Sequence, residues 1–210
     1  MTFPLIAVLA VLVGITLSGE RTSEPWRIWP KAAASACFIG VAVASGALDT
    51  PYGRWVLLAL ALGWIGDVAL AVDRRIWFVI GLGAFLLSHL AYLGAFQAHG
   101  LRAIAAGVTL VLLSIAAVAV GRWQLPHVTR GLRVPVIAYL AVITVMVAGA
   151  TGATSDGAPW PVLPAAVLFC VSDLAVARNQ FVTHGFVNRA IGLPMYYAAQ
   201  VLFAVSVGMV

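Results

Sequence analysis

Residues 101–120 read LRAIAAGVTLVLLSIAAVAV, and Arg102 is the only charged side chain among them. A helix of about 20 predominantly apolar residues is long enough to cross the hydrocarbon core of a bilayer. The rest of the chain has the same character, because 63% of its residues are hydrophobic and only 9% are charged. Soluble domains carry about a quarter charged residues. The composition therefore excludes a water-soluble protein and predicts an all-α, polytopic integral membrane protein.

Breaks in hydrophobicity divide the 210 residues into about eight membrane-spanning helices. At roughly 20 residues per span, this number leaves no room for a soluble domain, so we expect a single transmembrane domain over residues 1–210. The first segment lacks a positively charged leader, and further apolar segments follow it, so we interpret it as a retained helix. The predicted spans are residues 3–19, 32–48, 54–72, 76–98, 101–120, 132–151, 159–177 and 186–209.

Basic residues are distributed unevenly between the two sets of connections. Ten of the twelve follow the first, third, fifth and seventh spans, whereas Arg54 and Arg102 lie on the other side. By the positive-inside rule, this bias predicts extracytoplasmic termini and cytoplasmic basic loops. The net charge of +5 then reflects topology rather than a nucleic-acid partner, and we expect an integral protein of a bacterial plasma membrane. The ten residues are Arg21, Arg27, Lys31, Arg74, Arg75, Arg122, Arg130, Arg133, Arg178 and Arg189.

Two of the seven acidic residues lie inside apolar spans. Asp67 is in GWIGDVAL and Asp173 is in LFCVSDLAV, and neither has a basic neighbour in the sequence. An aspartate at the bilayer centre costs at least about 2.5 kcal/mol, so such a residue normally faces a cavity, a partner or a proton pathway. Both lie roughly 7 to 10 Å from the same end of their helices, so we predict that they face one cavity. Alternatively, each is structural and caps a backbone group or pairs with a loop arginine such as Arg75 or Arg178. We expect water to solvate the other five acidic residues, which are Glu20, Glu24, Asp49, Asp73 and Asp156.

Further polar side chains lie in three other spans. His89 and Tyr92 are helical neighbours in GLGAFLLSHLAYLGAF, where a lone histidine is often a hydrogen-bonded contact between helices. Tyr139 lies in the sixth span, and the eighth contributes Tyr196 and Gln200 from PMYYAAQ. The other histidines form no metal-binding pattern, and both cysteines lie in apolar runs. We therefore expect no metal and no cofactor.

Five segments follow one another over about residues 55–205: GWIGDVAL, GLGAFLLSHLAY, VPVIAYL, LFCVSDLAVARNQF and YYAAQVL. Together they resemble the lysoplasmalogenase family of membrane proteins, also called the YhhN or transmembrane protein 86 family. The resemblance implies a hydrolase that cleaves the vinyl-ether bond of a lysoplasmalogen or a related lysophospholipid. The products would be a fatty aldehyde and a glycerophosphoethanolamine or glycerophosphocholine. The matching motif positions are Asp67, His89, Tyr92, Tyr139, Asp173 and Gln200.

The chemistry that the resemblance implies fits a pair of carboxyl groups. Vinyl-ether hydrolysis begins with protonation of the alkene carbon, so it needs an acid and a nearby anion. Two carboxyl groups in a low-dielectric cavity resist double ionisation, so one can donate a proton while the other stabilises the cation and activates water. We therefore predict Asp67 and Asp173 as the catalytic pair, with the two roles unassigned, and no GxSxG nucleophile elbow competes with them. The predicted substrate-binding residues are His89, Tyr92, Tyr139, Arg178, Arg189, Tyr196 and Gln200, with the arginines directed at a lipid phosphate.

A different class of function stays open. Paired intramembrane aspartates also suit a proton-coupled transporter of small molecules or lipids, or a lipid-binding protein without hydrolysis. Against transport, only Pro194 clearly interrupts a helix, whereas transporters often have corresponding broken helices in both halves. Aldehyde release from a lysoplasmalogen would indicate the enzyme, and proton-dependent uptake without hydrolysis would indicate the transporter.

Overall fold

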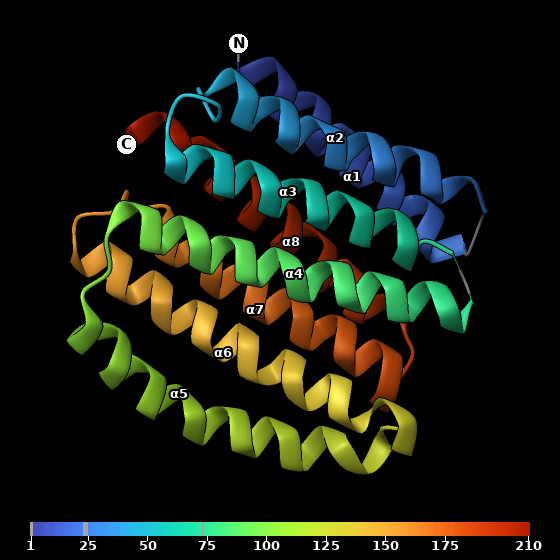
Figure 1. Ribbon diagram of the computed structural model, residues 1–210. Coiled ribbons are helices and arrows are strands. Elements are labelled where there is room, and N and C mark those ends of the chain that lie inside the picture. The colour runs from blue at the N-terminus through green and yellow to red at the C-terminus, as the bar shows by residue number, and fades with distance from the viewer. Residues whose placement is uncertain (1, 23–24, 73) are drawn as a thin grey trace.

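The computed structural model describes residues 2–22, 25–72 and 74–210, and within these ranges the chain forms eight α-helices and no strand (Figure 1). Seven of these helices are long and apolar enough to cross a membrane, and α2, with 17 residues, is shorter. The predicted all-α membrane bundle is confirmed, and each predicted span falls on one helix. The helices are α1 (Thr2–Thr22), α2 (Ile28–Ala44), α3 (Pro51–Leu70), α4 (Arg75–His99), α5 (Ala103–Gln124), α6 (Arg133–Ser155), α7 (Val162–Ala177) and α8 (Phe186–Ser206). Short 3₁₀ or π-helical turns flank them: η1 (Pro25–Arg27), η2 (Leu125–His127), η3 (Arg130–Leu132), η4 (Arg178–Val182) and η5 (Val207–Met209).

The second helix begins earlier than the hydropathy pattern predicts. It starts at Ile28 rather than at residue 32. Pro30 lies in its first turn, where a missing N–H leaves no intrahelical hydrogen bond unmade. The helix ends at Ala44, just before Gly46, whose φ of 87° is a left-handed conformation. Lys31, which we expected in a loop, is therefore a helical residue.

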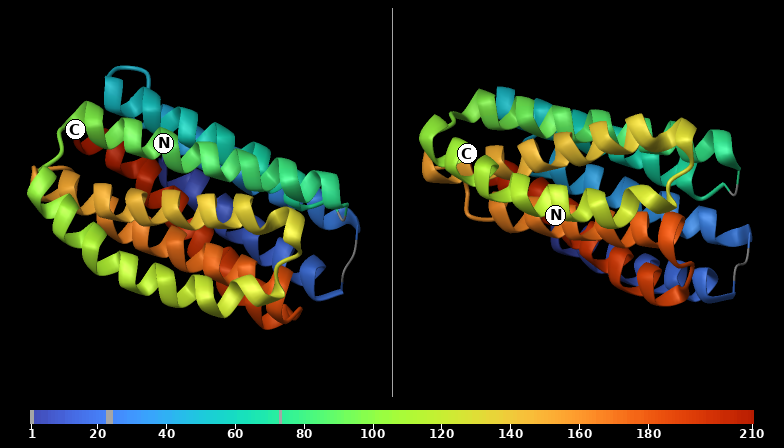
Figure 2. Two further views of the ribbon diagram at one scale, coloured as in Figure 1. Left: turned by 60° about the horizontal axis from the view of Figure 1, so that its bottom comes forward. Right: turned by 90° about the horizontal axis from the view of Figure 1, so that it is seen from below.

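Helices that are neighbours in the sequence run antiparallel and form the main packing units. The most extensive contacts join α1 with α2, α3 with α4, α5 with α6 and α7 with α8. Helix α8 lies inside the bundle, where it contacts α1, α2, α3 and α7 (Figure 2). Helix α5 lies at the edge and packs on α6, and none of its residues from 103 to 120 is buried. The side chains of α5 are thus left mainly to the surrounding lipid.

The two ends of the bundle differ in charge. The ten basic residues that follow odd-numbered helices lie where α1, α3, α5 and α7 end, which we call the basic end. Both chain termini lie at the opposite end, together with Arg54 and Arg102 (Figure 1). The antiparallel arrangement thus separates the charges as the sequence predicts. The assignment of the basic end to the cytoplasm stays a prediction.

Close contact between α3 and α4 brings an aromatic side chain against the helix that carries Asp67. A Cβ atom on Gly66 would lie 2.7 Å from the ring of Phe85, and one on Gly81 would lie 2.8 Å from Leu70. A larger residue at either position would require the facing side chain to shift. Gly66 therefore leaves room for the Phe85 ring beside the residue that precedes Asp67.

Candidate active site

A cavity of about 640 Å³ enters the bundle from the basic end. Its wall includes Arg74 and Arg75, which are exposed, and continues inward to Asp67, which is only 2% exposed. Asp173 lies on the same wall. The volume is within the range of small-molecule sites, about 300 to 1,000 Å³. The two aspartates that the sequence singled out therefore face one cavity that is large enough for a ligand.

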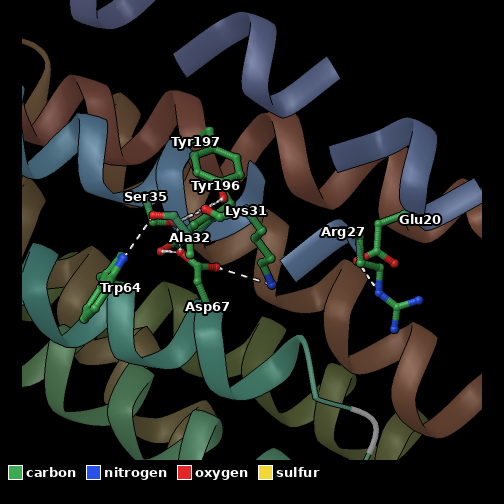
Figure 3. A network of polar contacts seen from close by, with 9 residues as sticks. All are labelled: Glu20, Arg27, Lys31, Ala32, Ser35, Trp64, Asp67, Tyr196 and Tyr197. Carbon is green, nitrogen blue, oxygen red and sulfur yellow. Dashed lines mark hydrogen bonds and ion pairs between the residues drawn. The ribbon is translucent and has the colours of Figure 1, made fainter. Parts of the chain in front are cut away.

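Asp67 lies in a network of donors from α2 and α8 (Figure 3). The ammonium group of Lys31 lies 3.5 Å from its Oδ1 atom. The hydroxyl groups of Ser35 and Tyr196 each lie 2.7 Å from Oδ2. A buried charge is stable only when it is paired and hydrogen-bonded, and Asp67 satisfies both conditions. Its partner is Lys31, not a loop arginine, so the arginine pairing considered from the sequence is wrong for this residue.

The Lys31 backbone is held in place by a second set of hydrogen bonds. The hydroxyl group of Tyr197 donates to the carbonyl oxygen of Lys31 at 3.1 Å. The Ser35 hydroxyl lies 3.0 Å from the same oxygen, so its single proton is shared between this carbonyl and Asp67. Trp64 on α3 donates its indole N–H to the carbonyl oxygen of Ala32 at 3.0 Å. These bonds tie α2 to α3 and α8, so Lys31 reaches Asp67 from a fixed position (Figure 3).

Asp173 belongs to a second network, formed with α4 and α6. Tyr139 donates a hydrogen bond of 2.9 Å to its Oδ2 atom. The Nε2 atom of His89 lies 3.2 Å from the same oxygen, at ion-pair distance but without the alignment of a hydrogen bond. The side chain of Asp173 is 13% exposed, against 3% for Asp67. The alternative pairing of Asp173 with Arg178 or Arg75 is also wrong, because the partners are a histidine and a tyrosine.

A contact with the backbone of its own helix orients the His89 ring. Its Nδ1 atom lies 2.6 Å from the carbonyl oxygen of Phe85. A carbonyl can only accept, so Nδ1 is the donor in this contact. The ring thereby presents Nε2 to the Asp173 carboxyl group. An imidazole and a carboxyl group, the two side chains most often used for proton transfer, thus lie side by side.

An aromatic layer separates the two networks. The ring centroid of Tyr196 lies 5.6 Å from that of Phe85 and 5.5 Å from that of Phe169. His89 packs on Phe169 with ring centroids 4.4 Å apart. Among the described residues, no hydrogen bond joins the two carboxyl groups directly. Each aspartate thus has its own partners, and the shared cavity is what connects them.

Three of the seven predicted substrate-binding residues line this cavity: Tyr139, Arg189 and Tyr196. Within the described part of the chain, the other four are not part of its wall, and their role in substrate binding stays a prediction. His89 is fully buried behind Asp173, and Tyr92 donates a 2.5 Å hydrogen bond to Gln200, away from the cavity. Arg178 donates to the side-chain oxygen of Asn188 at 2.8 Å. His89 and Tyr92 are neighbours on α4, but they face different helices.

A buried ion-pair cluster lies in the cavity wall near the basic end. Glu20 is 9% exposed, and its carboxylate lies 2.5 Å from Arg189 and 3.5 Å from Arg27. The expectation that water solvates Glu20 is wrong, because α8 brings Arg189 over it. Asp49 and Asp156 are exposed at the opposite end, as expected. Glu24 and Asp73 lie outside the described residues.

Sequence reasoning missed Lys31, Ser35 and Tyr197 as members of the site. From the sequence, Lys31 is only a topology signal, because it lies in the predicted loop before the span that begins at residue 32. The available signal was the i, i+4 spacing of Lys31 and Ser35, which places both on one helical face once the helix is extended to Ile28. Within the described ranges, no three His, Cys, Asp or Glu side chains gather as a metal site.

An all-α membrane bundle whose cavity is lined by one buried and one partly buried aspartate is the class of protein that this fold and this site define. The chain belongs to the YhhN family, whose model matches residues 26–207. The lysoplasmalogenase of Mycobacterium bovis is 34% identical in an alignment of 177 residues that covers 78% of this chain and 65% of that protein. Lysoplasmalogenase TMEM86A of Bos taurus is 32% identical over 76% of this chain and 67% of its own length. Lysoplasmalogenase TMEM86B of Mus musculus is 34% identical over 79% of this chain and 67% of its own length. The chain thus matches just under two thirds of the length of the mycobacterial relative, and no solved structure is significantly similar to it.

Proposed function

We propose that this protein is a membrane hydrolase that cleaves the vinyl-ether bond of a lysoplasmalogen or a related lysophospholipid. The names of its relatives support this reaction. The observation that carries the proposal is the contact of 3.2 Å between His89 Nε2 and Asp173 Oδ2, at the wall of a cavity that Asp67 also lines. Acid-catalysed cleavage of a vinyl ether needs a proton donor and a fixed negative charge, and these side chains are of the types that supply them.

Asp173 is the acid in this mechanism, because it lies on the cavity wall while His89 lies behind it. Asp173 donates its proton to the alkene carbon next to the one that bears the ether oxygen, and the remaining carbon becomes an oxocarbenium ion. Water adds to this ion and returns a proton to the carboxylate, giving a hemiacetal. The hemiacetal then loses the glycerol oxygen as an alcohol and becomes the aldehyde. His89 and Tyr139 position Asp173 and stabilise its charge after the transfer.

We assign the negative charge to Asp67. Lys31, Ser35 and Tyr196 lie within reach of its carboxylate and favour the ionised form. A carboxylate in a low-dielectric wall attracts the developing oxocarbenium ion more strongly than water does. The two roles that the sequence left open are thus assigned to separate networks. In this assignment the pair acts on one substrate without sharing a proton directly.

Hydrolysis in deuterium oxide tests this mechanism. The purified protein is incubated with lysoplasmalogen, and the aldehyde is analysed by mass spectrometry. We expect one deuterium at the carbon next to the aldehyde group, because that carbon receives the proton from the acid, and a rate lower than in ordinary water. A saturated ether analogue should not react. Aldehyde without deuterium at that carbon would contradict the acid mechanism, and proton-dependent lipid uptake into liposomes without aldehyde would support a transporter instead.

The charges near the cavity mouth lead to a prediction about the phosphate of the substrate. We infer that Arg189, which lines the cavity, binds this phosphate at the basic end, which we assign to the cytoplasmic side. Arg189→Gln should raise KM for a phosphorylated substrate about tenfold, with a smaller change in kcat. Arg178→Gln is the matched control, because Arg178 is not part of the cavity wall. Equal KM values for the two variants would remove Arg189 from the substrate site.

A further inference from the structure

A second, smaller cavity of about 150 Å³ lies between α5, α6 and α7. Its wall consists mainly of aliphatic side chains, among them Leu113 and Ala117 from α5 and Ile143 and Val147 from α6. Thr144 also lines it, but its hydroxyl group is bonded to the carbonyl oxygen of Leu140 at 2.6 Å. A dry apolar cavity of about 150 Å³ accepts a molecule such as benzene, or about six carbon atoms. Gln124, Tyr139 and Asp173 are the other polar residues of its wall, and the aliphatic remainder is suited to hydrocarbon.

The two cavities adjoin at the proposed acid. Tyr139, Asp173 and Ala177 line both of them. A molecule that occupied both cavities would therefore lie against the Asp173 carboxyl group. Its polar part would lie on the side of Arg189 and Lys31, and its apolar part would lie against α5.

Helix α5 lies between the small cavity and the lipid but does not close the cavity off. None of its residues from 103 to 120 is buried, and it lies at the edge of the bundle against α6 (Figures 1 and 2). Ala116, which lines the cavity, is itself exposed. A hydrocarbon chain longer than the cavity can thus continue past α5 into the bilayer without meeting a polar surface.

We propose that this second cavity binds the first carbons of the substrate's hydrocarbon chain, so that the bond to be cleaved lies at Asp173. This assignment rests on the proposed function. A lysoplasmalogen has one apolar chain and one phosphorylated head group, and the vinyl-ether bond joins them. The two cavities have the matching polarity on either side of Asp173, so the head group occupies the large cavity and the chain occupies the small one. Recognition of the chain next to the bond, rather than of its far end, then determines the specificity.

The test fills the small cavity from α5. Ala117→Phe introduces a ring into it, and Ala116→Phe does so from a neighbouring position. Ala119→Phe is the matched control, because Ala119 is exposed on the same helix and is not part of the cavity wall. Hydrolysis is measured with a hexadecenyl lysoplasmalogen and with a butenyl analogue. In parallel, binding of the saturated hexadecyl and butyl ethers is measured by thermal shift in detergent.

We expect Ala117→Phe and Ala116→Phe to lower kcat/KM for the hexadecenyl substrate about tenfold or more relative to the butenyl analogue, with Ala119→Phe unchanged. A folded Ala117→Phe variant with the wild-type ratio of the two substrates would overturn the chain site. If the wild-type protein releases no aldehyde, the proposed reaction is wrong. The binding measurements alone then test whether the small cavity holds a hydrocarbon chain. Loss of hexadecyl ether binding in Ala117→Phe but not in Ala119→Phe would retain the hydrocarbon site, and equal binding would remove it.

Discussion

Replacing Asp173 with Asn should lower kcat for lysoplasmalogen by about a hundredfold or more, because an amide cannot donate the proton that starts the reaction. The protein should still fold, since Asn has the shape of Asp and retains an oxygen that can accept from Tyr139. Aldehyde release in single-turnover experiments measures the effect on the chemical step. Asp49→Asn is the matched control, because Asp49 is exposed at the opposite end of the bundle. A folded Asp173→Asn variant that retains most of its activity would show that this carboxyl group is structural.

The same assay tests whether the two aspartates act on one step. Asp67→Asn should also lower kcat, because it removes the negative charge that stabilises the oxocarbenium ion. If both residues serve one transition state, the double variant should be scarcely slower than the slower single variant. Effects that multiply would indicate two independent roles.

Replacing Lys31 with Met should lower the free energy of unfolding by about 3 kcal/mol, because it leaves the buried carboxylate of Asp67 without its counter-charge. This value is at the low end of the range for broken buried pairs, since Lys31 lines the cavity and water can reach it. Unfolding in mixed detergent micelles measures the loss. Met has nearly the same length as the lysine side chain, so the packing changes little.

Asp67, the other member of the ion pair with Lys31, provides the control. Adding Asp67→Asn to Lys31→Met removes the unpaired charge, so the double variant should regain most of the lost stability. Arg75→Met, at an exposed position near the cavity mouth, should change stability by less than about 0.5 kcal/mol. Additive losses in the Lys31 and Asp67 variants would show that the two charges do not stabilise one another.

The helices could be predicted from the sequence because they depend on local composition. Twenty apolar residues in a row form a membrane helix regardless of what they pack against. Asp67 and Asp173 could be recognised for the same reason, since a charge in an apolar run is expensive wherever the helix lies. The helix ends were less predictable: α2 extends to Ile28 because a proline is tolerated in its first turn, and hydropathy does not register this.

The partners of the two aspartates could not be predicted, because they depend on how helices rotate against one another. Lys31 lies 36 positions before Asp67, and His89 lies 84 positions before Asp173, and only the packed bundle joins them. The spacing of His89 and Tyr92 correctly placed both on adjacent positions of one helix. It did not reveal that one faces α7 and the other faces α8.

The order in which polar partners occur along the chain has a consequence for biosynthesis. Membrane proteins are made from the N-terminus, so a helix that enters the bilayer can only meet helices that were synthesised before it. Lys31 is already present when Asp67 is synthesised, His89 and Tyr139 precede Asp173, and Glu20 precedes Arg189. Asp67, Asp173 and Arg189 therefore each find a partner on an earlier helix. The last helix, α8, adds Tyr196 to Asp67 and closes the cavity, so the site is completed only when the whole chain has been inserted.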